Sequence, residues 1–208
     1  MSDTVQSRIE NLHPITDLIL NRQAKEKKLQ QRAKVIWLYG ISGSGKSTLA
    51  NALERRLFKE GFSTTLLDGD NIRTGINAGL GFSDEDRIEN NRRVAEVSKL
   101  FADSGIITIN SFITPLNSLR ELIKEILGAD LIQVHISCSY KKSEERDVKG
   151  LYAKAKSGKI KNFTGKDSSF EDPSSDKPAD LVINTEKETL EQSLETLYNY
   201  VIKQISYP

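Results

Sequence analysis

The sequence lacks the features of a disulfide-bonded, membrane-spanning or nucleic-acid-binding protein. Its single cysteine, Cys138, excludes a disulfide within the chain. Charged residues interrupt every hydrophobic segment, so no run approaches the roughly 20 consecutive apolar residues that span a bilayer. The 30 Lys and Arg residues nearly balance the 29 Asp and Glu residues, and a net charge of +1 creates no overall field for nucleic acid or an anionic membrane. We therefore expect neither kind of partner.

Two smaller absences concern targeting and metals. The first ten residues are polar and lack the apolar core of a signal peptide, so we expect a cytoplasmic protein. Histidine occurs only at His13 and His135, far apart in the chain. Within one predicted strand, His135 and Cys138 stand at odd spacing, which would put them on opposite faces and argues against a shared metal site.

Length and composition fit one domain with an extension. At 208 residues and 37% hydrophobic content, the chain can bury a single core, which we assign to residues 35–208. Residues 1–34 form an N-terminal extension that we expect to pack on the domain. The basic run within residues 22–34 is interpreted as a solvated helix face in preference to a binding patch.

Hydrophobic patterns alternate between strand and helix along the domain. Strands are predicted over residues 35–39, 63–67, 106–112, 131–138 and 179–184, and helices over 47–60, 84–104, 115–127 and 189–205. Gly61 stands where the first of these helices needs a left-handed terminating residue. This alternation predicts an α/β fold with a five-stranded, mostly parallel sheet and helices on both faces.

A lysine- and glycine-rich stretch interrupts this pattern near residues 149–166, where no acidic residue occurs. Such a stretch cannot form a core element. We interpret it as a lid at about residues 147–170.

The strongest motif is a P-loop, which reads Gly40-Ile41-Ser42-Gly43-Ser44-Gly45-Lys46-Ser47. An uncharged strand precedes it and a helix follows it, as this motif requires. Glycines let successive backbone N–H groups curl around one anion, and the start of the helix adds its positive dipole end. Lys46 is predicted to reach the β- and γ-phosphates of ATP, and the Ser47 hydroxyl to bind Mg²⁺. A chance glycine-rich turn is the alternative.

The P-loop alone leaves the phosphate acceptor open, since switches and motors transfer phosphate to water. The sequence contains no Asn-Lys-x-Asp motif for guanine, and the strands predicted from residues 106 and 131 do not end in paired acids. These absences disfavour a GTPase or motor. A phosphotransferase acting on a second substrate is favoured.

Candidate residues for that second substrate follow the second strand. Asp68 and Asp70 alternate and would share one side if the strand continued through them, so that one could orient a hydroxyl. They could equally be turn formers. Ser83 is predicted to cap a helix on which Arg87 and Asn90 share a face. That face suits either a second anion or solvent, and periodicity alone leaves both open.

Taken in order, the segments 40–47, 68–73, 80–83, 86–90, 146–152 and 160–165 resemble adenylylsulfate kinase. The resemblance covers about residues 11–200. It implies a three-layer P-loop NTPase fold with a lid. It also implies transfer of the γ-phosphate of MgATP to the 3′-hydroxyl of adenosine 5′-phosphosulfate, giving 3′-phosphoadenosine 5′-phosphosulfate and ADP in sulfate assimilation.

The same resemblance implies roles for individual residues. The catalytic residues would be Lys46, Asp70 as the group that positions or deprotonates the hydroxyl, and Thr114. Arg73, Arg87 and Asn90 would hold the phosphosulfate. Phe82 and Phe163 would stack on the substrate adenine, and Lys149 would close over the phosphates. The full predicted substrate set is Asp68, Arg73, Phe82, Arg87, Asn90, Ile113, Lys149, Leu151 and Phe163.

One segment departs from the family pattern. The family usually has Phe-Ile-Ser-Pro followed by a charged run, whereas this chain has Phe112-Ile113-Thr114-Pro115 and then uncharged Leu116 and Asn117. The family serine has been regarded as a phosphate acceptor, and threonine keeps a hydroxyl there. We favour direct in-line transfer, and we expect either a weaker affinity for the substrate or a different acceptor.

Two rival interpretations remain from the sequence. One is another small P-loop kinase, for a nucleoside, shikimate or a sugar acid, although the Phe82 and Phe163 pair favours an acceptor that carries adenine. The other is a regulatory nucleotide-binding subunit without turnover, docked on an ATP sulfurylase. The family commonly forms dimers, so a homodimer is expected.

Overall fold

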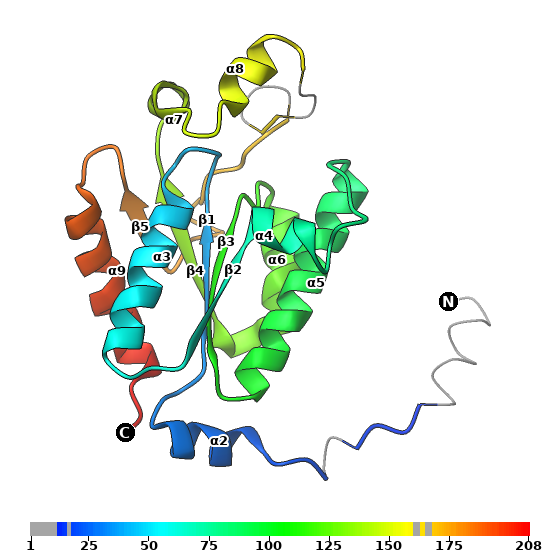
Figure 1. The fold of residues 1–208 in the computed structure, drawn as a ribbon, viewed down its shortest axis with the longest axis vertical. Helices are drawn as coiled ribbons and strands as arrows, with labels where there is room; N and C mark the ends of the chain where they lie inside the picture. Colours follow the sequence, from blue (N-terminus) through cyan, green and yellow to red (C-terminus); the bar gives the residue numbers. More distant parts are fainter. Residues whose placement is uncertain (1–11, 16–17, 160–162, 165–167) are drawn as a thin grey trace.

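The computed structural model describes residues 12–15, 18–159, 163–164 and 168–208 and contains a parallel sheet with helices on both faces (Figure 1). The strand order is β2-β3-β1-β4-β5, and each of the four adjacent pairs is parallel. The strands are β1 (Val35–Tyr39), β2 (Thr64–Asp68), β3 (Ile107–Phe112), β4 (Leu131–Ser137) and β5 (Leu181–Asn184). The predicted α/β class and five-stranded parallel sheet are confirmed.

The helices of the described residues connect these strands, with one helix before β1 and one after β5. They are α2 (Arg22–Leu29), α3 (Lys46–Lys59), α4 (Gly69–Thr74), α5 (Asp84–Asp103), α6 (Asn117–Leu127), the 3₁₀ turn η1 (Gly128–Asp130), α7 (Tyr140–Arg146), α8 (Leu151–Lys156) and α9 (Leu190–Ile205). Helices α3 and α9 cover one face of the sheet, and α5 and α6 cover the other (Figure 1). None of these helices is long and apolar enough to cross a bilayer.

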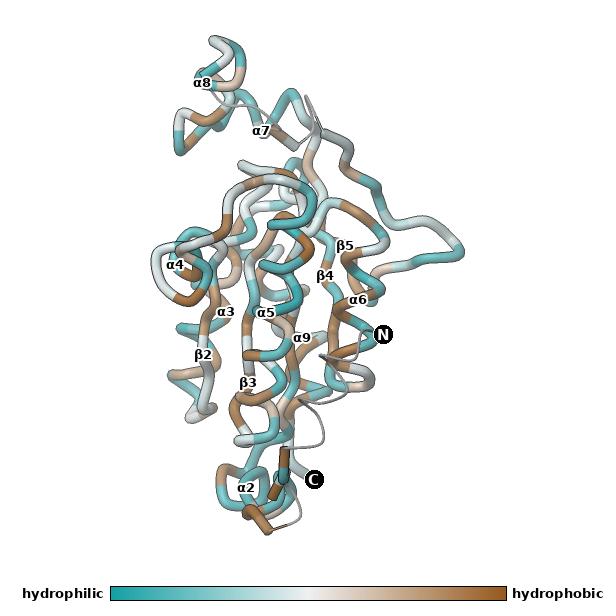
Figure 2. The backbone as a smooth tube through the Cα atoms, turned by 90° about the vertical axis from the view of Figure 1, so that its right-hand side faces the viewer, coloured by the Kyte–Doolittle hydropathy of each residue, from teal (hydrophilic) through white to brown (hydrophobic). Residues whose placement is uncertain are grey.

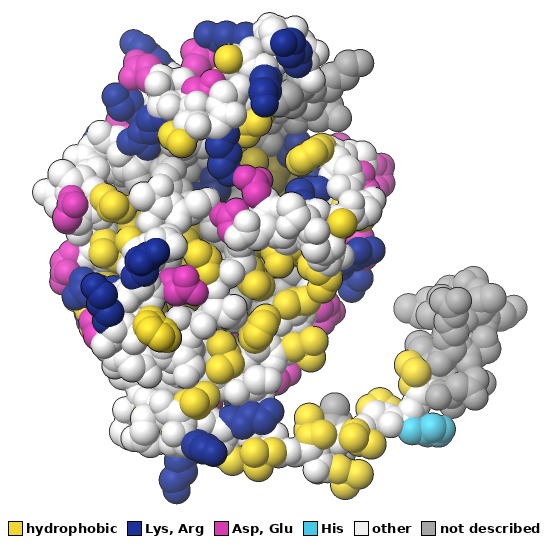
Figure 3. All heavy atoms as spheres, viewed as in Figure 1, with side chains coloured by type: hydrophobic (Ala, Val, Ile, Leu, Met, Phe, Trp, Pro, Cys, Tyr) yellow, Lys and Arg dark blue, Asp and Glu magenta, His cyan; other side chains and the backbone are white. Residues whose placement is uncertain are grey.

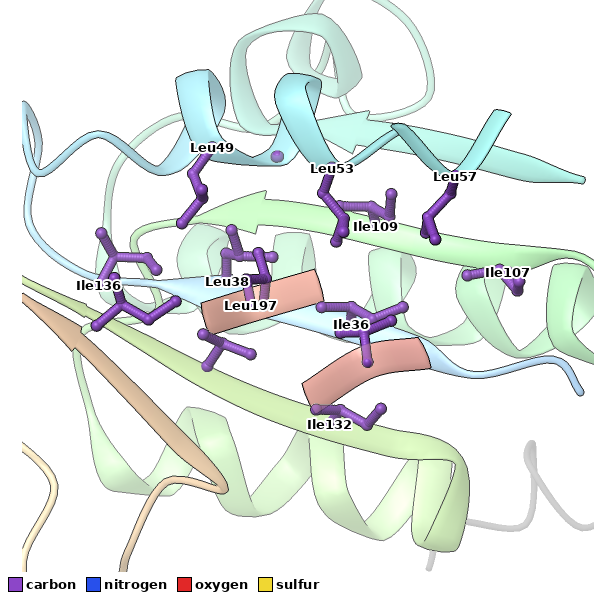
Figure 4. Close-up of a cluster of buried hydrophobic side chains, with 14 of the residues drawn as sticks. Ile36, Leu38, Leu49, Leu53, Leu57, Ile107, Ile109, Ile132, Ile136 and Leu197 are labelled. Atoms are coloured by element: carbon purple, nitrogen blue, oxygen red, sulfur yellow. The ribbon is translucent and has the colours of Figure 1, made fainter. Parts of the chain in front are cut away.

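Strand β1 occupies the centre of the sheet, and its side chains alternate between two cores. Ile36 and Leu38 pack with α3 and α9, as Figure 4 shows for their contacts with Leu53 and Leu197. Trp37 belongs to the opposite core, beneath α5 and α6. Because both faces are covered, all five residues of β1 are buried, which explains its uncharged, β-rich sequence.

The outer helices show the periodicity expected of half-buried elements. Along α5, hydrophobic and hydrophilic residues alternate within each turn (Figure 2). Ser83 caps this helix by accepting a hydrogen bond from the backbone N–H of Asp86 at 3.2 Å. Gly61 follows α3 with φ +91°, in the left-handed conformation that its position predicted. Both predicted helix boundaries are therefore confirmed.

The N-terminal part packs on the domain only from α2 onward. Arg22 donates to the carboxylate of Asp130 and to the main-chain oxygen of Ala33, and Gln31 donates to Gly105 O at 2.7 Å. The described apolar residues before α2 are exposed, with Leu18 at 82% (Figure 3). The expectation that the extension packs on the domain is wrong for these residues, and residues 1–11 and 16–17 lie outside the described part.

The alternation expected for His135 and Cys138 does not hold, because β4 ends at Ser137 and Cys138 lies beyond it. Both residues line one cavity of about 490 Å³ beside Ile41. His135 stacks between Tyr39 and Phe170, at ring distances of 5.2 and 5.8 Å. Among the described residues, no group of three or more His, Cys, Asp or Glu residues could hold a metal ion.

Candidate active site

The P-loop joins the end of β1 to the start of α3, and two of its glycines are dictated by close backbone contacts. At Gly40, with φ +155°, a Cβ atom would lie 2.5 Å from the main-chain oxygen of Ile136. At Gly43, with φ +77°, it would lie 2.9 Å from Ser143 O. Any larger residue would displace the backbone at either position. The loop therefore places its N–H groups at the amino end of α3, where an anion is stabilised.

Lys46 begins α3 and is buried within the loop. Its Nζ donates to the main-chain oxygen of Ile41 at 2.7 Å. Burial, reinforced by the positive charge of Lys149, lowers the pKa of Lys46 to about 7. A polyphosphate beside this amine would favour the charged form, so the site is electrostatically matched to such an anion.

Ser47 lies in a cluster of oxygen atoms that comes from three elements. Its hydroxyl donates to the carboxylate of Asp68 at 2.7 Å and lies 3.1 Å from the Ser111 hydroxyl. Asp68 ends β2 and Ser111 belongs to β3, so parallel strands bring both to the same edge of the sheet. The sequence-based prediction found no acidic pair at the ends of the strands from residues 106 and 131, and it did not assign Asp68 this role at the end of β2. The uncharged residues before Asp68 are the sequence signal for such a strand-terminal acid.

The geometry expected for Asp68 and Asp70 is wrong. The strand ends at Asp68, whose carboxylate accepts a hydrogen bond from the Asp70 N–H at 3.1 Å and caps α4. The two side chains are therefore not alternate residues of one strand. The carboxylate of Asp70 instead pairs with the ammonium group of Lys149.

A cavity of about 880 Å³ extends from the P-loop beneath the segment that carries α7 and α8, where the surface is hollowed (Figure 3). It brings together most of the residues that the sequence singled out. Those lining it are Ser42, Gly43, Gly45, Lys46, Ser47, Asp68, Asp70, Arg73, Phe82, Arg87, Asn90, Ile113, Thr114, Lys149, Leu151 and Phe163. Three P-loop residues do not line it: Gly40, Ile41 and Ser44.

Two aromatic rings and two guanidinium groups also line this cavity, those of Phe82, Phe163, Arg73 and Arg87. The Arg73 guanidinium lies 4.5 Å from the centre of the Phe82 ring, which is 63% exposed, whereas Phe163 is 7% exposed. Burial lowers the pKa of both Arg73 and Arg87, and Arg87 lowers that of Arg73 further. A bound anion would relieve this desolvation and repulsion. The cavity can therefore hold an aromatic, anionic molecule in addition to a phosphate at the P-loop.

Asn90 is supported by a residue that the sequence did not single out. Asn77 is fully buried and donates to the side-chain oxygen of Asn90 at 3.0 Å. The bond fixes the amide of Asn90 where α5 lines the cavity. No local sequence pattern revealed this pairing, because the two residues belong to different elements.

The segment predicted as a lid contacts the P-loop directly. The Tyr152 hydroxyl donates to Ser42 O at 2.7 Å, and Arg146 donates to Thr185 O at 2.6 Å. Thr185 in turn donates to Ser44 O at 2.7 Å. Sequence reasoning gave no roles to Tyr152, Arg146 or Thr185. Residues 160–162 and 165–167 of the predicted lid, and with them part of the 160–165 motif, lie outside the described residues.

Thr114 adopts a left-handed conformation, with φ +42°, and is 2% exposed. Its hydroxyl accepts a hydrogen bond from the Trp37 indole at 2.9 Å and donates to the Asn91 side-chain oxygen at 3.3 Å. The hydroxyl therefore has two partners and little exposure. This arrangement suits a structural role better than a phosphate-accepting one.

Comparison with known proteins decides the family. A family model described as adenylylsulphate kinase matches residues 32–184 of this chain. The chain belongs to the adenylylsulphate kinase family. The adenylyl-sulfate kinase of Phocaeicola vulgatus is 54% identical over 194 residues, covering 93% of this chain and 94% of that protein. The adenylyl-sulfate kinase of Bacteroides fragilis is 53% identical over 197 residues, covering 94% and 96%.

Solved structures agree with this membership in the adenylylsulphate kinase family. The Mycobacterium tuberculosis APS kinase CysC, solved in complex with AMPPNP and APS, superposes with a TM-score of 0.74 at 43% identity. The match covers 80% of this chain and 96% of that one. The predicted P-loop NTPase fold and kinase class are thereby confirmed.

Proposed function

We propose that this protein transfers the γ-phosphate of ATP to the 3′-hydroxyl of adenosine 5′-phosphosulfate (APS) and releases 3′-phosphoadenosine 5′-phosphosulfate and ADP. The observation that carries the proposal is one cavity lined both by P-loop residues and by Phe82, Phe163, Arg73 and Arg87. Support comes from the M. tuberculosis structure, whose complex contains both AMPPNP and APS. The family's name supports the same acceptor.

The residues of the cavity divide the chemistry between them. The P-loop N–H groups and Lys46 would stabilise the charge that develops on the transferred phosphate. Asp70, which lines the cavity and pairs with Lys149, would orient the attacking hydroxyl and accept its proton. Arg73 and Arg87 would bind the phosphosulfate, while Phe82 and Phe163 would stack on adenine. Direct in-line transfer is proposed, because the Thr114 hydroxyl is already engaged.

The oxygen cluster at Ser47 fits Mg²⁺. Mg²⁺ takes oxygen ligands and usually combines one or two protein groups with phosphate oxygens and waters. The Ser47 hydroxyl and the Asp68 carboxylate, 2.7 Å apart, provide such groups beside the P-loop. When bound, the ion would neutralise charge on the β- and γ-phosphates.

The loss of charge at Leu116 and Asn117 has a local structural correlate. Asn117 opens α6, its N–H donates to the Glu171 carboxylate, and its side-chain oxygen accepts from Arg120 at 2.6 Å. The main chain and the side chain of Asn117 therefore both form hydrogen bonds at the start of α6. A weaker affinity for APS than in relatives with a basic residue there stays a prediction.

Turnover with a panel of acceptors tests the proposal. ADP release should require APS, and nucleosides, shikimate or gluconate should not replace it. A 3′-deoxy analogue of APS should bind without turnover, and ³¹P NMR of the natural product should place the new phosphate on the 3′-oxygen. Release of ADP with the 3′-deoxy analogue would contradict the proposed acceptor atom.

Four further expectations accompany the function. We propose a homodimer located in the cytoplasm and acting in sulfate assimilation, because the family commonly dimerises and the reaction activates sulfate. Sedimentation of the purified chain measures the oligomeric state. Association with an ATP sulfurylase also remains a proposal, tested by co-sedimentation with that enzyme.

A further inference from the structure

Arg120 of α6 is a buried charge whose hydrogen-bond acceptors carry no net charge. It is 5% exposed, and burial lowers the pKa of its guanidinium. One nitrogen, Nη1, donates to Thr114 O at 2.9 Å and to Pro115 O at 3.3 Å. The other, Nη2, donates to the Asn117 side-chain oxygen at 2.6 Å and to Glu171 O at 2.7 Å. Burying a cation costs free energy, which these four hydrogen bonds offset in part. A buried arginine at this position therefore suggests a role beyond packing of the helix.

Three of the four bonds join two segments that lie far apart in the sequence, and the fourth goes to Asn117 at the start of α6. Residues 113–116 form the loop between β3 and α6, and residues 168–172, here called the return segment, precede β5. Arg120 bridges them, and the backbone adds a direct contact, because Glu171 N donates to Pro115 O at 2.9 Å. The side chain of Glu171 also accepts from the N–H of Asn117. We call this arrangement, with Arg120 at its centre, the clasp.

Aromatic rings fix the plane of the guanidinium. Arg120 lies 4.8 Å from the ring centre of Tyr39 and 5.9 Å from that of Phe170. Tyr39 ends the central strand that leads into the P-loop, and Phe170 belongs to the return segment. A planar guanidinium can stack and donate in several fixed directions at once, whereas a lysine ammonium group cannot. The clasp is therefore specific for arginine.

Each clasped segment leads to a wall of the main cavity. Ile113, Thr114 and Pro115 line the cavity from one side. The return segment connects to Phe163, because Ser168 N donates to Phe163 O at 3.3 Å. Phe163 lines the same cavity and would stack on the acceptor in the proposed function. The clasp thus joins the Thr114 loop to the segment that bonds Phe163.

We propose that Arg120 is a positioning residue for phosphoryl transfer, which holds the Thr114 loop against the return segment and so places Phe163 for the acceptor. This inference rests on the proposed function, since it assigns Phe163 to the acceptor. The bonds that Tyr152, Arg146 and Thr185 donate to P-loop carbonyl groups do not involve Arg120. Loss of the clasp should therefore affect the acceptor more than ATP.

Steady-state kinetics of Arg120→Lys and Arg120→Met test the proposal. We expect the KM for APS to rise about tenfold or more, while the KM for ATP changes less than about twofold. Arg55→Lys serves as the control, because Arg55 is exposed on α3 and donates to Asn51 of the same helix at 2.8 Å. Equal increases in both KM values, or no increase for APS, would overturn the proposal.

A double-mutant cycle with Phe163→Leu separates positioning from general destabilisation. If Arg120 acts through Phe163, Arg120→Lys should raise the KM for APS much less in the Phe163→Leu background than in wild type. Full additivity of the two effects would contradict the inference. Where Arg120→Met fails to fold, Asn117→Ala, which removes a single acceptor of the clasp, should reproduce the same selective rise in smaller degree.

The same assays distinguish failure of this inference from failure of the proposed function. Wild-type protein that does not turn over APS contradicts the proposed function and removes the basis of the inference. Wild-type protein that turns over APS, together with an Arg120→Lys variant of unchanged KM for APS, contradicts the inference alone.

Discussion

The carboxylate of Asp70, on α4, and the ammonium group of Lys149, between α7 and α8, form an ion pair at the main cavity. Both side chains are largely exposed, so the pair itself contributes little to stability. Its importance is positional, because it connects the proposed base to the segment over the P-loop. An acceptor hydroxyl at Asp70 would replace Lys149 as the partner of that carboxylate.

Asp70→Asn should reduce kcat by orders of magnitude and leave the folded state intact. Asparagine keeps the shape of the side chain but cannot accept the hydroxyl proton, and Asp70 is exposed enough to be replaced without a packing defect. Single-turnover kinetics and thermal unfolding measure the two quantities. Lys149→Met is the matched control, which removes the ion pair and keeps the base. If kcat fell to a similar extent in both variants, the ion pair would be required for turnover and Asp70 would not act as the base.

Phe163→Ala should weaken the binding of APS more than that of ATP. Stacking of a base on an aromatic ring contributes ~1–3 kcal/mol, which corresponds to about tenfold or more in affinity. Phe163 also packs edge-on against Tyr152 at 4.8 Å, so part of the loss will reflect altered packing. Tyr140→Leu controls for this, because Tyr140 also packs on Tyr152, with ring centres 5.2 Å apart, and does not line the main cavity. Isothermal titration with each nucleotide measures the difference, and a loss confined to ATP would reverse the assignment.

Thr114→Val should cost stability and preserve turnover. Valine has the same shape but leaves the buried Trp37 indole N–H without its acceptor, which costs about 1–3 kcal/mol. Thr114→Ser keeps the hydroxyl and should recover most of that loss. Urea unfolding and kcat are the two measurements. A folded Thr114→Val protein without turnover would contradict direct in-line transfer and favour a phosphorylated intermediate at this residue.

Folding stability should fall between about pH 6.5 and 4 because of His135. Burial between two rings lowers the pKa of this imidazole to about 4. Across that range the unfolded chain binds a proton that the folded chain does not, so the folded state loses stability as the pH falls. The full loss is roughly 3–4 kcal/mol by the linkage relation, and it levels off below pH 4. Urea unfolding at pH 7 and pH 4.5 measures it.

A matched pair of variants isolates this residue. His135→Phe retains a ring between Tyr39 and Phe170 and should lose most of the pH dependence. His13→Gln, which changes an exposed histidine before α2, should keep it. An unchanged pH dependence in His135→Phe would contradict the assignment.

The fold was predictable because its signals are local. The uncharged run of β1, the glycines after it and the helical spacing of α3 are all contiguous in the sequence. Three short helices were missed, namely α4, α7 and α8. They are too short for periodicity, and Asp68 begins α4 through a side-chain cap that alternation cannot reveal.

Residues of the candidate site that belong to a contiguous motif were predictable from the sequence. Residues that reach the site only through tertiary contacts were not. The P-loop and the residues around Phe82 and Arg87 line one cavity, as the ordered motifs implied. The pairing of Ser47 with Asp68 joins residues 21 positions apart, and that of Arg146 with Thr185 spans 39. Such pairs depend on which strands are neighbours, and the strand order comes only from the structure.

The central strand has a consequence for the durability of the site. Since β1 is buried on both faces and bonded to β3 and β4, its amide protons should exchange with solvent only when the whole domain opens. The phosphate-binding turn begins directly after β1, so its first residue is held by the most stable part of the sheet. We therefore expect that fluctuations of the segment carrying α7 and α8 would admit and release nucleotides without displacing the phosphate-binding turn.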